Sequence, residues 1–94
     1  MNRPKLKDEA ILTAISNLKI KIEIALRKKG NGCFASSHEI LGVITEEYYE
    51  LIEAVYNCSK LPDKEKKEWI TGELLDIAVG CIIGVASIND VDWL

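Results

Sequence analysis

Four acidic side chains occur in two pairs, and the spacing within each pair places both members on one face of a helix. Glu47 and Glu50 form the first pair, and Glu73 and Asp76 form the second. Because an α-helix turns by about 100° per residue, positions i and i+3 project from nearly the same side. Two antiparallel helices that carry such pairs bring four carboxylates to one point. The spacing therefore predicts a site built from carboxylate oxygens.

The residues around the first pair are apolar. Glu47 falls inside an apolar arc of its helix, and Glu50 lies at the edge of that arc. The arc contains no Lys or Arg. Its apolar members are Ile40, Val43, Ile44, Tyr48, Leu51, Ala54 and Val55. An ionised carboxylate on an apolar face is costly unless a cation or hydrogen bonds compensate its charge. Two alternatives to a bound cation stay open: a partner helix supplies a lysine, or the face is partly exposed.

The second pair stands beside small residues. Asp76 is the only charged residue in the stretch from 74 to 83, and its side of the helix continues through Gly80, Gly84 and Ser87. Glycine inside a helix costs about 1 kcal/mol relative to alanine, so these glycines require a compensating gain. Tight helix packing and space for a ligand are both open explanations, and one glycine can serve each.

An all-oxygen site favours a hard divalent cation, Mg²⁺ with Mn²⁺ as a substitute. A di-iron centre is disfavoured, because such bundles use Glu-x-x-His and no histidine follows His38. Cys33, Cys58 and Cys81 form no CxxC pair, which argues against structural zinc. Since Mg²⁺ usually completes its shell with water and phosphate oxygens, we expect a nucleotide or another polyphosphate as substrate.

Two loop signals divide the chain into three long amphipathic segments. Residues 30–32 and 59–63 carry the glycine, asparagine and proline that are typical of loops. We expect helices over about 8–29, 36–57 and 63–88, the second opened by a capping box of Ser36 and Glu39. Short connections favour antiparallel neighbours, so residues 1–94 are predicted to form a single all-α antiparallel bundle.

The first predicted helix has two apolar sides. Ile20 and Ile24 lie opposite a stripe that consists of Ile11, Ile15, Leu18, Ile22 and Ala25. A chain of 94 residues cannot cover both sides alone. We therefore expect a homodimer or homotetramer in which helices of different subunits complete one bundle.

Charge and composition argue against a nucleic-acid partner, secretion and a membrane-spanning segment. A net charge of −3 provides no basic field for duplex nucleic acid. The N-terminal sequence MNRPKLKDEA lacks the apolar core of a signal peptide, and together with the odd cysteine count this favours a reducing, cytoplasmic location. The apolar run from Leu74 to Ile88 contains Asp76 and is interpreted as too short to span a membrane, hence as a buried helix.

The strings EEYYE at 46–50 and ELLD at 73–76 resemble the EExxE…ExxD signature of the MazG-like all-α NTP pyrophosphohydrolases. The resemblance covers residues 33–88 and implies hydrolysis between the α- and β-phosphates of an NTP or dNTP, giving the monophosphate and pyrophosphate. It implies that the four acids named first are the Mg²⁺ ligands. It further implies a catalytic group of Glu46, Glu47 and Glu50, in which Glu46 orients water or supports a ligand from outside the metal shell.

Residues for substrate contact are less sharply marked. Related enzymes often recognise the base near the start of the metal-binding helix, where Phe34 and His38 stand in this chain. Phe34 closing a small core and His38 merely starting a helix are the competing explanations. Five lysines and arginines are either phosphate contacts or solvated helix charges, namely Lys19, Lys21, Arg27, Lys28 and Lys29. The alternative to an enzyme is a non-catalytic helical interaction module, or a nucleotide sensor, that retains the fold.

Overall fold

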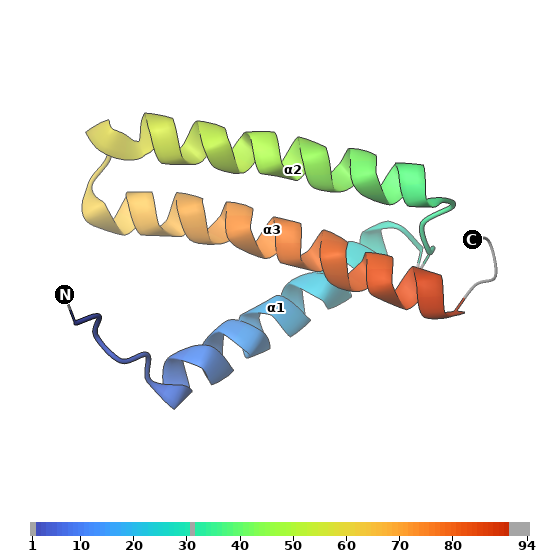
Figure 1. Cartoon of the computed structure of the whole chain (residues 1–94), viewed down its shortest axis with the longest axis horizontal. Coiled ribbons are helices and arrows are strands. Elements are labelled where there is room, and N and C mark those ends of the chain that lie inside the picture. Colours follow the sequence, from blue (N-terminus) through green and yellow to red (C-terminus); the bar gives the residue numbers. More distant parts are fainter. Residues whose placement is uncertain (1, 31, 91–94) are drawn as a thin grey trace.

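Three α-helices make up the fold seen in the computed structural model, which describes residues 2–30 and 32–90 (Figure 1). The helices are α1 (Asp8–Lys28), α2 (Ser37–Asn57) and α3 (Asp63–Asp90), with a short 3₁₀ turn, η1 (Cys58–Lys60), between the last two. The described residues contain no strand. The predicted all-α bundle is confirmed, and the predicted helix ends differ from the observed ones by at most two residues.

Local chemistry explains where the helices begin and end. Ser36 caps α2, because its hydroxyl accepts a hydrogen bond from the Glu39 backbone N–H at 3.1 Å. The Glu39 carboxylate accepts in return from the Ala35 N–H at 3.1 Å, one residue before the partner expected in a capping box. At the end of α1, Gly30 takes φ 64°, a left-handed conformation that glycine adopts without strain.

Helices α2 and α3 run antiparallel and side by side, as Figure 1 shows. Their contact is close because α3 presents glycines to isoleucines of α2. A Cβ added to Gly80 would lie 2.9 Å from Ile44 Cδ1, and one added to Gly84 would lie 3.2 Å from Ile40 Cγ2. Of the two explanations left open for these glycines, helix packing therefore applies to both. The side chain of Ser87, the next residue on this stripe, is likewise taken up by contacts within the protein.

Ser87 ties the α1–α2 loop to α3. Its side chain is 2% exposed, and its hydroxyl accepts from the Phe34 N–H at 3.0 Å and donates to the Ile83 carbonyl at 2.7 Å. Phe34 in turn packs with Val79 and Ile83 to form the centre of the core. This small core joins the end of α1, the loop and α3.

Helix α1 crosses α3 obliquely, and its backbone makes no close approach to α2 within the described residues (Figure 1). Only its C-terminal half reaches the core, through Leu18, Ile22, Ala25 and Leu26. Ile11 and Ile15, at the N-terminal end of the predicted stripe, remain 42% and 55% exposed in the single chain. The crossing angle carries the N-terminal half of α1 away from α3.

The apolar arc of α2 is partly exposed, which is one of the alternatives that the sequence left open. Tyr48 and Val55 are 54% and 50% exposed, because α3 covers a narrower face than the whole arc. Helix α3 contains a window of mean hydropathy 1.7 and is, by length and composition, long enough to cross a membrane. The run from Leu74 to Ile88 is one part of this longer helix, and the core helix of a soluble protein meets the same criterion.

Candidate metal centre and adjoining pocket

The structure brings the four predicted acids together. Glu47 and Glu50 project from α2, Glu73 and Asp76 project from α3, and each offers one carboxylate oxygen such that these oxygens all lie within 4.8 Å of one another. We call this group the acidic cluster. It forms because the i and i+3 pairs of two antiparallel helices face each other at the same level of the bundle.

Two oxygens of the acidic cluster are buried without compensation. Glu47 Oε2 and Glu73 Oε2 are shielded from solvent, and neither has a hydrogen-bond partner among the described residues. Leaving a buried carboxylate oxygen unpaired is unfavourable, more so than for a neutral polar atom. A divalent cation among the four carboxylates would offset part of their charge, so the donor set fits Mg²⁺ or Mn²⁺.

Burial and the neighbouring carboxylates raise the pKa values of two acids in the cluster, Glu47 and Glu73. The pKa of Glu47 is raised from its ordinary value of 4.5 to about 7, chiefly because the carboxyl is buried. The charge of Glu50 and a hydrogen bond with Glu50 add to this rise, as do the charges of Asp76 and Glu73. Burial also raises the pKa of Glu73, together with the charges of Glu50 and Asp76, while Lys21 opposes that change. These carboxylates are held in a site that disfavours their charged forms.

One lysine approaches the acidic cluster from α1. Lys21 Nζ lies 3.2 Å from Asp76 Oδ1, and the two side chains are 38% and 42% exposed. This is the contribution of a partner helix that the sequence left open, but it reaches Asp76 and not the buried oxygens of Glu47 and Glu73. The lysine therefore compensates one edge of the cluster only.

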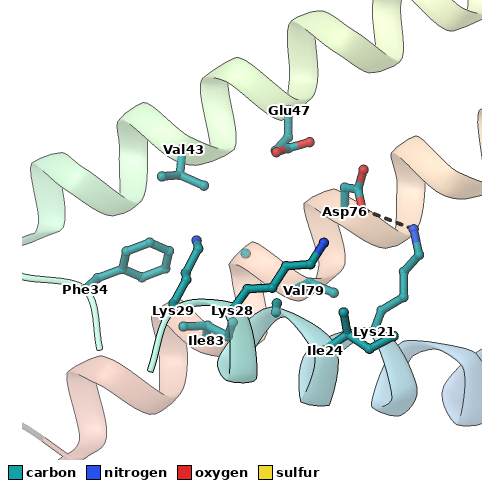
Figure 2. Close-up of a pocket in the computed structure, with 12 residues that line it drawn as sticks. Lys21, Ile24, Lys28, Lys29, Phe34, Val43, Glu47, Asp76, Val79 and Ile83 are labelled. Carbon is teal, nitrogen blue, oxygen red and sulfur yellow. Dashed lines mark hydrogen bonds and ion pairs between the residues drawn. The ribbon is translucent and has the colours of Figure 1, made fainter. Parts of the chain in front are cut away.

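A pocket of about 320 Å³ adjoins the acidic cluster and is lined by residues of α1, α2, α3 and the α1–α2 loop (Figure 2). Its floor is apolar and its rim carries both signs of charge. Glu47 and Asp76 face it from one end, and Lys28 extends toward the same space from α1. The complete lining is Lys21, Ile24, Ala25, Lys28, Lys29, Phe34, Val43, Glu47, Asp76, Val79, Gly80 and Ile83. Gly80 thus serves both helix packing and the pocket wall.

The predicted substrate-contact residues separate in the structure. Phe34 lines the pocket but is 5% exposed and belongs to the core, with the ammonium of Lys29 5.6 Å from its ring centroid. His38 is exposed in the first turn of α2 and is not part of the pocket wall. Glu46 is likewise exposed and lies outside the acidic cluster. Of the basic residues considered, Lys21, Lys28 and Lys29 line the pocket, whereas Lys19 and Arg27 do not.

No protein-family model, curated protein or solved structure matches this chain. The family resemblance consequently remains an interpretation of two motifs, and the geometry of the acidic cluster carries the functional argument.

Proposed function

We propose that this chain is a Mg²⁺-dependent nucleoside triphosphate pyrophosphohydrolase, with Glu47, Glu50, Glu73 and Asp76 as the metal ligands. The observation that supports this most is the acidic cluster itself: each of its four residues offers a carboxylate oxygen within 4.8 Å of the others, and Glu47 and Glu73 each have a buried oxygen without a partner. A protein that gathers four carboxylates in this way without a cation sacrifices stability for no structural return.

The adjoining pocket supports a substrate that is anionic at one end and flat or apolar at the other. Three lysines at its rim suit phosphate oxygens, since an ammonium offers several charged donors. The apolar floor, which includes Val43, Val79 and Ile83, suits a nucleobase or sugar. Bound Mg²⁺ would neutralise charge on phosphate oxygens and lower the pKa of an attacking water.

Each group of residues has a role in this proposal. The four acids hold the metal, and Glu50, the most exposed of them, leaves the cluster open toward solvent and substrate. Phe34 supports the pocket from the core, and stacking on a base is not its proposed role. The cleavage position between the α- and β-phosphates is taken from the family resemblance alone.

The direct test is pyrophosphate release from a panel of NTPs and dNTPs in the presence of Mg²⁺. Wild type is expected to release pyrophosphate and the monophosphate, and both Glu50→Gln and Asp76→Asn are expected to abolish release. Glu53→Gln, an exposed acid on α2 outside the cluster, is the matched control and should retain activity. Activity that survives both ligand substitutions would remove the proposed site.

A non-catalytic helical module is the second candidate, favoured by the amount of exposed apolar surface. The single chain exposes 7538 Å², whereas a compact monomer of this mass exposes about 5,400 Å². Calorimetry with Mg²⁺ and a non-hydrolysable nucleotide separates the two functions. A module that only interacts with other proteins should give no heat that depends on Asp76, and a nucleotide sensor should bind without turnover.

The same surface supports a homo-oligomer, dimer or tetramer. The radius of gyration of 15.4 Å exceeds the roughly 12 Å of a compact domain of this length. The excess surface is larger than the approximately 800 Å² that each partner contributes to an interface of standard size. We propose that the exposed half of α1, with Ile11 and Ile15, packs on a second copy. Light scattering that shows a monomer at micromolar concentration would contradict this.

A cytoplasmic location follows from the same proposal. Helix α3 carries Glu73 and Asp76 in the acidic cluster and packs along both other helices, which makes it a core helix in this reading. Carboxylates inside a bilayer are expensive, so a membrane position for α3 would conflict with the metal site. Recovery of the protein in the membrane fraction after removal of peripheral proteins would refute this assignment.

A further inference from the structure

The ion pair between Lys21 and Asp76 joins two elements that otherwise meet through apolar contacts. Lys21 is on α1 and Asp76 is on α3, and their charged atoms are 3.2 Å apart (Figure 2). The other ion pair among the described residues, Lys66 with Asp63, lies within the first turn of α3 and does not involve the acidic cluster. Lys21 is thus the one cation in direct contact with the cluster in the described part of the chain.

The position of Lys21 makes it a weak and exchangeable counter-ion. It satisfies one oxygen of a group of four carboxylates, and both members of the pair are more than one third exposed. Exposed pairs of this kind are weak, and a divalent cation held by several ligands readily displaces the ammonium. The side chain has a flexible four-carbon stem, so the ammonium can leave Asp76 without movement of α1.

We propose that Lys21 is a displaceable internal counter-ion: it neutralises Asp76 in the metal-free protein, competes with the divalent cation for that carboxylate, and after release binds the phosphate oxygens of an anionic substrate. This inference rests on the proposed metal-dependent function and assigns Lys21 a role within it. The competition with the cation concerns the metal-free protein, and the phosphate contact concerns the metal-loaded one.

The Lys21 ammonium, once released from Asp76, can bind an anion in the adjoining pocket, which Lys21 lines. Lys21 lines the same pocket as Lys28 and Lys29, and Figure 2 shows Lys21 and Lys28 both extending toward the end that Glu47 and Asp76 form. Before the metal binds, the four acids repel an anion and Lys21 is engaged with one of them. After the metal binds, its two positive charges offset part of the negative charge of the four acids, and Lys21 is free. The arrangement therefore favours binding of the cation first and the anion second.

The first measurement is the affinity for Mg²⁺ alone, by calorimetry, in wild type, Lys21→Met and Lys21→Arg. Methionine keeps most of the apolar stem and removes the charge, so the competition disappears and Mg²⁺ should bind about two- to fivefold more tightly. Arginine restores a cation next to Asp76 and should return the affinity to that of wild type or below. Lys19→Met, an exposed lysine on the same helix outside the pocket, should bind Mg²⁺ as wild type does.

The second measurement is the affinity for a non-hydrolysable triphosphate analogue with Mg²⁺ at saturation. Lys21→Met loses a charged hydrogen bond to phosphate and should bind the analogue at least about fivefold more weakly. Lys19→Met should again match wild type. One substitution is therefore expected to strengthen metal binding and to weaken anion binding, which general damage to the fold does not produce.

Three results would overturn the inference. If Lys21→Met and wild type bind Mg²⁺ equally, or if Lys21→Met weakens both ligands, Lys21 does not compete with the cation. If Lys28→Met strengthens Mg²⁺ binding as much as Lys21→Met does, the effect is the general field of the pocket and not the contact with Asp76. If wild type and all variants give no Mg²⁺ heat, the proposed function itself fails, and the role of Lys21 fails with it.

Discussion

Replacing Glu47 by glutamine should stabilise the metal-free protein. The pKa of Glu47 is raised to about 7 in the fold from an ordinary value of 4.5, so its charged form is disfavoured by at most about 3–4 kcal/mol. The carboxylate is only partly buried, and we expect solvent screening to reduce the gain to about 1–2 kcal/mol. Glutamine has no charge to desolvate, so this cost disappears in the variant. In a domain of this size the melting temperature should rise by about 5–15 °C at about pH 8.

The stability of the metal-free protein should fall as the pH rises, and the advantage of Glu47→Gln should grow with it. Because the pKa of Glu47 is raised in the fold, the native state holds a proton between pH 4.5 and about 7 that the unfolded chain releases. The stability from this proton is fully present below pH 4.5 and is lost as the pH rises through about 7. The raised pKa of Glu73 acts in the same direction. Wild type without metal should therefore melt at a higher temperature in mild acid, and the advantage of Glu47→Gln should vanish there.

The assay is thermal unfolding by circular dichroism in a chelating buffer, at fixed protein concentration, at both ends of this pH range. Glu53→Gln is the matched control, because Glu53 is exposed on the same helix and outside the acidic cluster. It should change the melting temperature little at either pH. A Glu47→Gln protein that is less stable than wild type at high pH, or equally shifted at both pH values, would refute the reasoning that the cluster is held under electrostatic strain.

Three other substitutions test the frame around the site. Ser87→Ala leaves the Phe34 N–H without its partner and should cost about 1–3 kcal/mol in urea unfolding; a cost below about 0.5 kcal/mol would mean that the hydrogen bond does not anchor the loop. Gly84→Ala places a Cβ 3.2 Å from Ile40 Cγ2 and should destabilise by about 1–2 kcal/mol despite its better helix propensity. Gly42→Ala meets nothing within 4 Å and should stabilise by about 0.5–1 kcal/mol, so equal effects of the two glycine changes would contradict the packing assigned to Gly84.

Sequence periodicity was sufficient for the helices, because their signals are local. The Ser36 cap and the glycine at position 30 mark helix ends through bonds and dihedral angles within a few residues. The path of α1 is not local. Whether Ile11 and Ile15 meet α3 depends on a crossing angle that the packing of the whole chain sets, and their periodicity is the same in either case.

The candidate site divides in the same way. The convergence of the four acids follows from i, i+3 spacing on two antiparallel helices, so the sequence predicted it correctly. The contact of Lys21 with Asp76 spans 55 residues and depends on where α1 crosses α3. Its weak signal was the presence of several lysines on α1, which did not distinguish Lys21 from the exposed Lys19. Similarly, the small residues from Gly80 to Ser87 indicated that something packs closely against this side of the helix, but they did not show whether it is another helix or a ligand.

The most direct test of the metal site is a crystal grown with Mn²⁺ and measured for anomalous scattering. We expect an anomalous difference peak enclosed by Glu47, Glu50, Glu73 and Asp76, with Lys21 moved away from Asp76. Four carboxylates that point apart into solvent, with no peak among them in crystals soaked at high Mn²⁺, would contradict it.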